Sequence, residues 1–159
     1  MKITDRDSHF MRIALKEAEK AAALGEVPVG AVIVRGDKVI SRAHNLREKG
    51  KNALCHAEII AIDRACKRLG GWRLWECDMY VTLEPCPMCA GAIINSRIEH
   101  VFFGARDEKA GAIFSRTTLF DMGFNHKPDV TEGVLQAECS AVLSDFFRRL
   151  RLKRKNESK

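Results

Sequence analysis

The chain has 159 residues, of which 46% are hydrophobic and 30% charged, and its 27 Lys and Arg exceed its 21 Asp and Glu to give a net charge of +6. This length predicts one domain with its own core, and this composition excludes an intrinsically disordered chain. The modest basic excess is typical of proteins with a polyanionic partner and also of many ordinary enzymes.

The first half of the chain opens with a helical stripe of apolar residues, which ends at Gly25. In chain order, the patterns predict a helix over residues 8–24, a hairpin of strands over 29–34 and 39–43, a polar loop over 46–52 and a helix over 57–69. The second helix ends at Gly70 and Gly71, since glycine is the usual residue after a helix C-terminus.

The second half alternates strands and helices. In chain order, it predicts a strand over 79–83, a helix from Pro85 and Pro87 to about Ser96, a strand over 100–104, a short helix over 117–122, a short edge strand over 130–131 and a final helix over 135–152. Proline marks a helix start because it is tolerated only in the first turn. A hairpin followed by this alternation predicts an α/β fold with a mixed sheet and helices on both faces.

The longest uncharged stretch, residues 85–96, is much shorter than the ~20 apolar residues of a membrane-spanning helix. Polar residues open the chain, with no apolar block of the signal-peptide kind. We therefore expect a cytoplasmic protein with no membrane partner. Because the cytoplasm keeps thiols reduced, metal binding or burial is a better expectation for the six cysteines than disulfide bonds, and burial is expected for Cys66, Cys77 and Cys139.

Two short motifs, each at an expected helix start, contain the candidate chemistry. They are Cys55-His56-Ala57-Glu58 and Pro85-Cys86-Pro87-Met88-Cys89. Cys86 and Cys89 are close enough in sequence to place both sulfurs on one helix face, and a helix N-terminus favours the thiolate form that binds metal. With His56 they form a ligand set that suits zinc and leaves the fourth tetrahedral position for water, as in catalytic sites.

Glu58 and His56 converge only if His56 caps the helix, outside regular helical geometry. In that case Glu58 lies near the metal without ligating it and can transfer protons. Taken singly, the motifs have ordinary explanations: a Cys-x-x-Cys also occurs in redox pairs and zinc knuckles, and a His-x-Glu at solvated helix starts. Their combination favours catalysis. Cys55 as a fourth ligand would close the site, but consecutive residues rarely point to one place, so we expect a small buried thiol.

His-Ala-Glu followed by Pro-Cys-x-x-Cys is the signature of zinc nucleobase deaminases. Segments 26–32, 81–86 and 103–107 match as well. Over about residues 8–150 the chain resembles the bacterial tRNA-specific adenosine deaminases. The resemblance implies a three-layer cytidine-deaminase-like fold with a mixed five-stranded sheet and helices on both faces, a homodimer with one Zn²⁺ per subunit, and conversion of the wobble adenosine of a tRNA anticodon stem-loop to inosine with release of ammonia.

Carried residue by residue onto this chain, the resemblance implies that His56, Cys86 and Cys89 bind zinc and that Glu58 is the proton shuttle. It also implies a set of substrate-binding residues: Asn45 at the target nucleoside, Val27, Pro28, Ala57, Glu84 and Pro85 as pocket-wall or backbone contacts, and Asp107 in a loop near the RNA.

Two other functions stay open. A deaminase of a free nucleobase or nucleoside (guanine, cytosine or cytidine) would keep the chemistry and change the substrate, whereas a zinc-stabilised RNA-binding module would have four protein ligands. The sequence predicts a single zinc-dependent deaminase domain over 1–152 and a mobile basic tail over 153–159. Basic residues between Arg148 and Lys155 fit phosphate contact, and equally the general preference of cations for a helix C-terminus.

Overall fold

A computed structural model of the chain describes residues 2–158. Its elements are, in chain order, α1 (Asp5–Ala23), β1 (Gly30–Arg35), β2 (Lys38–His44), α2 (Ala57–Leu69), β3 (Cys77–Leu83), α3 (Pro87–Ser96), β4 (His100–Ala105), the 3-10 helix η1 (Leu119–Asp121), β5 (Asp129–Thr131) and α4 (Gln136–Glu157). Each predicted strand and helix is present, the one at 117–122 as the shorter η1.

Helix α3 begins at Pro87, since Pro85 lies before its N-cap, Cys86, and two other helices extend well beyond their predicted bounds. Helix α1 begins before Ser8 because Thr4 and Asp7 form a capping box, in which the Thr4 hydroxyl accepts from the Asp7 backbone N–H and the Asp7 carboxylate accepts from the Thr4 backbone N–H. Helix α4 continues to Glu157 because the residues after Leu152 are mostly good helix formers. The division of the chain into a domain and a tail stays a prediction.

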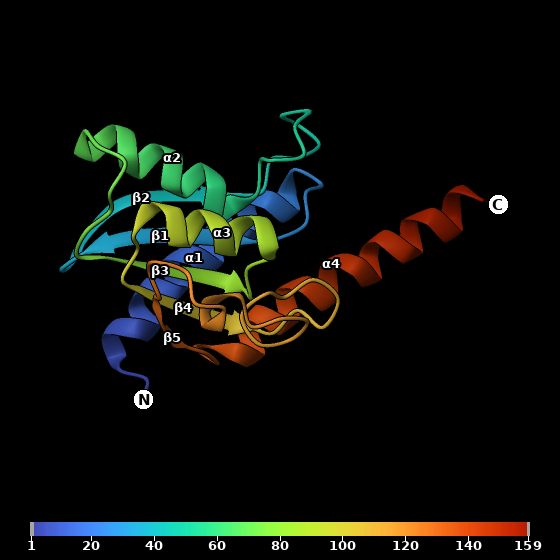
Figure 1. Ribbon diagram of the computed structural model, residues 1–159. Coiled ribbons are helices and arrows are strands. Elements are labelled where there is room, and N and C mark those ends of the chain that lie inside the picture. The colour runs from blue at the N-terminus through green and yellow to red at the C-terminus, as the bar shows by residue number, and fades with distance from the viewer. Residues whose placement is uncertain (1, 159) are drawn as a thin grey trace.

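The five strands form one sheet in the order β2-β1-β3-β4-β5. Strand β1 runs antiparallel to β2 and β3, whereas β3, β4 and β5 run parallel to one another. Helices α2 and α3 pack on one face, and α1 and the first part of α4 pack on the other (Figure 1). The mixed five-stranded sheet between two helical layers is therefore confirmed.

The molecule has two hydrophobic cores, one on each face of the sheet. The central strands contribute to both, because successive side chains of a strand point to opposite faces. In β1, Ala31 and Ile33 join the cluster under α2 and α3, while Val32 and Val34 join the cluster under α1. Both faces are buried, so the strand is a continuous apolar run rather than an alternating one. Gly30 lies where α1 crosses β1, and a Cβ there would overlap the backbone oxygen of Ala14.

The strand directions bring four distant segments of the chain to one edge of the sheet. The start of β1 and the ends of β2, β3 and β4 all lie there, because β1 is antiparallel to its neighbours and β4 is parallel to β3. Helices α2 and α3 begin at the same edge. In open α/β sheets, the carboxyl ends of parallel strands are the usual ligand-binding edge.

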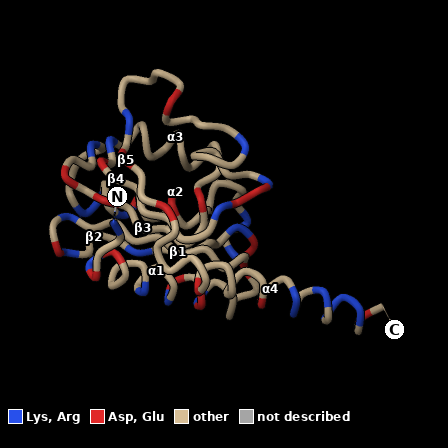
Figure 2. Tube along the Cα trace, turned by 90° about the horizontal axis from the view of Figure 1, so that it is seen from below, with Lys and Arg blue, Asp and Glu red and all other residues tan. Residues whose placement is uncertain are grey.

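The C-terminal half of α4 projects away from the rest of the molecule (Figure 1). Figure 2 shows Lys and Arg along this projecting part. Within residues 2–158, no helix combines the length and the apolar character that a membrane span requires.

Candidate active site

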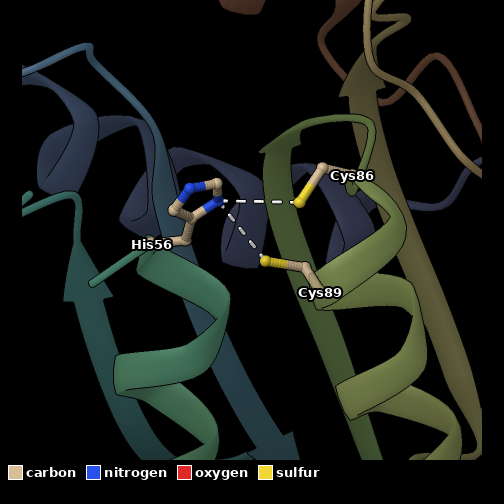
Figure 3. Close-up of side chains that lie close together, drawn as sticks. All are labelled: His56, Cys86 and Cys89. Atoms are coloured by element: carbon tan, nitrogen blue, oxygen red, sulfur yellow. Dashed lines mark hydrogen bonds between the residues drawn. The ribbon is translucent and has the colours of Figure 1, made fainter. Parts of the chain in front are cut away.

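Three candidate metal ligands meet where α2 and α3 begin. His56 is the N-cap of α2, Cys86 is the N-cap of α3, and Cys89 lies in the first turn of α3 (Figure 3). The N-cap position gives His56 extended backbone angles, φ −76° and ψ 150°. The condition for His56 and Glu58 to converge is thus met, since His56 lies outside the regular helix.

The spacing of the three ligand atoms fits one zinc ion. The Nδ1 atom of His56 lies 3.7 Å from the Cys86 Sγ and 3.6 Å from the Cys89 Sγ, and the three ligand atoms lie within 4.8 Å of one another. A tetrahedral ion with Zn–S bonds of ~2.3 Å and a Zn–N bond of ~2.0–2.1 Å requires N···S separations of about 3.6 Å. Among the described residues, Cys55 is not part of this cluster.

The two candidate cysteine ligands differ in the direction in which their surroundings shift the thiol pKa. A hydrogen bond from the Cys89 thiol, aided by His56, lowers the pKa of the Cys86 thiol to about 4, and the same Cys86–Cys89 hydrogen bond together with burial raises the pKa of Cys89. The hydrogen bond with Cys86 also raises the pKa of His56, against the effect of burial. The cluster therefore favours a thiolate, the form that ligates zinc, and metal binding must displace the remaining protons.

Glu58 is a buried carboxylate beside the candidate metal ligands. It is only 4% exposed and lines the same pocket as His56 and Cys86. Burial, with a further contribution from the Cys86 charge, raises the pKa of Glu58 to about 7. A carboxyl group with a pKa near the working pH can both take up and give back a proton, which suits a general acid and base.

The pocket in front of these residues has a volume of about 190 Å³. This is below the about 300–1,000 Å³ of sites that enclose drug-sized ligands, so the pocket suits a group as small as one nucleobase. Of the predicted substrate-binding residues, it is lined by Val27, Asn45, Glu84 and Asp107. A larger groove, of about 790 Å³ between α1 and α4, contains none of the predicted metal or acid–base residues.

Three predicted substrate contacts lie behind the pocket surface. Pro28, Ala57 and Pro85 are buried beside the pocket without lining it. The Ala57 backbone N–H donates to the Asn45 Oδ1 at 2.8 Å. This bond fixes the orientation of the Asn45 amide, because the oxygen is occupied and the NH₂ group is left to donate into the pocket.

Sequence reasoning missed four residues that line the pocket, namely Val29, Leu83, Ala110 and Arg47. The first three are ordinary apolar residues and give no signal in the sequence. Arg47 lies in the polar loop that follows Asn45, and this proximity is a signal that could have indicated it. Of the cysteines expected to be buried, Cys77 and Cys139 are buried and Cys66 is half-buried.

Comparisons with known proteins agree with this arrangement. The family model described as MafB19-like deaminase matches residues 5–151. A Bacillus subtilis protein named tRNA-specific adenosine deaminase is 52% identical over 151 residues, which cover 94% of each chain. The chain belongs to the tRNA-specific adenosine deaminase family.

Two solved deaminase structures superpose on this chain to different extents. A structure from work on A-to-I editing by tRNA:A34 deaminases superposes with a TM-score of 0.84 at 44% identity and covers 86% of this chain and 99% of that one. A Bacillus subtilis guanine deaminase superposes less well, with a TM-score of 0.62 at 30% identity and coverage of 81% and 84%. The first of these relatives confirms the cytidine-deaminase-like fold expected from the sequence.

Proposed function

We propose that this protein catalyses the zinc-dependent hydrolytic deamination of adenosine to inosine at the wobble position of a tRNA anticodon and releases ammonia. The observation that supports it most is the placement of buried Glu58 in a base-sized pocket beside His56, Cys86 and Cys89. The strong identity to proteins named tRNA-specific adenosine deaminase favours adenosine in tRNA as the substrate.

His56, Cys86 and Cys89 would hold one Zn²⁺ per subunit, as the fit of their spacing to a tetrahedral ion indicates. Bound zinc supplies a Lewis acid that allows water to ionise near neutral pH. Glu58 takes one proton from the attacking water and delivers it to a ring nitrogen of the base. It then moves the second proton of that water, carried by the newly added hydroxyl, to the departing amine, so that the C–N bond breaks and ammonia leaves. Its raised pKa, caused by burial, fits this two-way transfer.

The remaining pocket residues bind and orient the base. The Asn45 amide, held by the Ala57 backbone, donates from its NH₂ group to an acceptor on the target nucleoside. The small pocket admits a base only after it leaves the stack, and this costs less in an anticodon loop than in a duplex. We further propose a homodimer located in the cytoplasm.

The alternative substrate is a free nucleobase or nucleoside, which the similarity to a guanine deaminase makes the relevant competitor. Inosine formation in an anticodon stem-loop, measured beside ammonia release from free guanine, cytosine and cytidine, distinguishes the two. A preference for the free bases would contradict the proposal. A zinc-stabilised module without catalysis would require a fourth protein ligand, and among the described residues the cluster has three.

The proposal is tested by zinc analysis and an anticodon-loop assay on one preparation. We expect one zinc per subunit in the wild type and loss of both zinc and activity in Cys86→Ser. The matched control is Cys66→Ser, because Cys66 is half-buried, lies outside the cluster and contacts the backbone oxygen of Trp72. Stoichiometric zinc in Cys86→Ser would remove Cys86 from the ligand set.

A further inference from the structure

Two buried carboxylates at the pocket, those of Glu26 and Glu84, take no part in the proton transfers described above. Glu26 precedes the pocket residue Val27, Glu84 itself lines the pocket, and each of the two glutamates is 2% exposed. Within residues 2–158, neither forms an ion pair with a Lys, Arg or His. A buried charge without a cation must be satisfied by hydrogen-bond donors, so the identity of those donors indicates what each carboxylate does.

Glu26 holds the loop that follows β2. Its two carboxylate oxygens accept from the backbone N–H groups of Glu48 at 3.0 Å and Lys49 at 2.8 Å. Both amides belong to the polar loop over residues 46–52, and the residue just before them, Arg47, lines the pocket. The carboxylate therefore fixes the backbone on which Arg47 stands.

Glu84 holds the loop that follows β4. Its oxygens accept from the backbone N–H groups of Asp107 at 3.1 Å, Ile113 at 3.1 Å, Phe114 at 2.8 Å and Ser115 at 3.0 Å, and from the Ser115 hydroxyl. This loop, residues 106–116, supplies Asp107 and Ala110 to the pocket lining. The loop wraps the carboxylate so closely that a Cβ at Gly111 would overlap it.

The two loops lie on opposite flanks of the pocket. Sheet order places β2 on one side of the central β1–β3 pair and β4 on the other, and the loops follow the ends of β2 and β4 at the same edge. Glu26 lies in the turn before β1 and Glu84 directly follows the last residue of β3, so both glutamates lie between the two loops. Each carboxylate thus reaches outward from the centre of the site to one loop.

We propose that Glu26 and Glu84 are positioning residues for deamination, each holding through backbone N–H groups one of the two loops that flank the base pocket. This inference rests on the proposed function. The resemblance implies that Glu84 is a pocket-wall or backbone contact of the substrate, and Glu84 lines the pocket while both of its oxygens accept from the loop over 106–116. A glutamine could not replace either residue, because its NH₂ group would face backbone N–H groups that need an acceptor.

The test compares Glu26→Gln and Glu84→Gln with Glu17→Gln. Glu17 is a matched control because it is 3% exposed and accepts from Lys20 and His44, and neither it nor these partners line the pocket. We expect each of the two test variants to raise KM for an anticodon stem-loop about 10-fold while kcat falls less than about 3-fold, since weakened substrate binding raises KM without altering the reacting groups. The control should change neither constant.

Hydrogen exchange supplies a second measurement that is independent of activity. Glu84→Gln should speed exchange at Asp107 and 113–115 and spare 48–49, whereas Glu26→Gln should do the reverse. General destabilisation cannot produce this crossed pattern. If Glu84→Gln does not fold, Ser115→Ala removes a single donor and should give the same local exchange change with a smaller rise in KM.

Equal KM values in the test and control variants, or an exchange increase spread evenly over the chain, would overturn the positioning role. If the wild type forms no inosine in the stem-loop, the proposed function fails, and the exchange pattern alone decides whether the two carboxylates hold the loops.

Discussion

Asn45 has two separable roles, and two substitutions at this position divide them. Its Oδ1 accepts from the buried Ala57 N–H at 2.8 Å, which secures the start of α2. Its NH₂ group donates to no acceptor within residues 2–158, so it can donate to substrate. Asn45→Asp keeps the acceptor and places a negative charge at a helix N-terminus, so stability should stay within about 1 kcal/mol. The lost donor bond is worth about 1–3 kcal/mol, which predicts a fall in kcat/KM of about 5- to 150-fold.

Asn45→Ala loses both roles. It leaves the Ala57 N–H buried without an acceptor, which should cost about 1–3 kcal/mol in the free energy of unfolding in addition to the loss of activity. Urea unfolding and inosine formation in a stem-loop measure the two effects, and Asn95→Asp, at an exposed position on α3, controls for the charge change. An Asn45→Asp variant within about 3-fold of wild-type kcat/KM, a change smaller than the weakest bond in that range allows, would refute the donor role. An Asn45→Ala variant as stable as the wild type would refute the helix role.

Three further predictions concern the proton shuttle, acid stability and the basic end of α4. Glu58→Gln should retain zinc but lose ~10²–10⁴ in kcat, the usual share of acid–base catalysis, and near-normal turnover would exclude Glu58 from the mechanism. Burial acts against the charge of Glu17, but hydrogen bonds from Lys20 and His44 outweigh it and lower the pKa of Glu17 below its ordinary 4.5. The ionised Glu17 carboxylate therefore stabilises the fold fully above pH 4.5, and this stabilisation is lost as the pH falls through the lowered pKa. In urea unfolding, Glu17→Gln should lose less stability on acidification than the wild type. Parallel curves of unfolding free energy against pH for the two proteins would contradict this. Truncation after Leu152 should lower the slope of log affinity for tRNA against log salt by about 0.7–0.9 for each lost phosphate contact, and an unchanged slope would exclude these residues as phosphate ligands.

The order of the helices and strands could be predicted because the signal for each element lies in its own residues or their immediate neighbours. The stripe of α1, the apolar run of β1 and the prolines before α3 are all local signals. Helix boundaries were less accurate, because Thr4 and Asp7 start α1 by a capping box that an apolar stripe does not reveal. The continuation of α4 to Glu157 was missed because its last turns have no apolar face.

The sequence by itself determined the metal ligands and Glu58 as candidates, since His56, Glu58, Cys86 and Cys89 lie in two short motifs whose chemistry depends on local spacing at helix starts. Only the tertiary structure decided what surrounds them. Val27, Asn45, Glu84 and Asp107 are distant in sequence, and they meet because β1 runs antiparallel to β2 and β3 while β4 runs parallel to β3. Hydrogen bonds occupy the Glu84 carboxylate and the oxygen of the Asn45 amide, and they join segments that the order of the strands brings together. Which strands pair depends on residues far apart in the chain, so no single stretch of the sequence could predict these bonds.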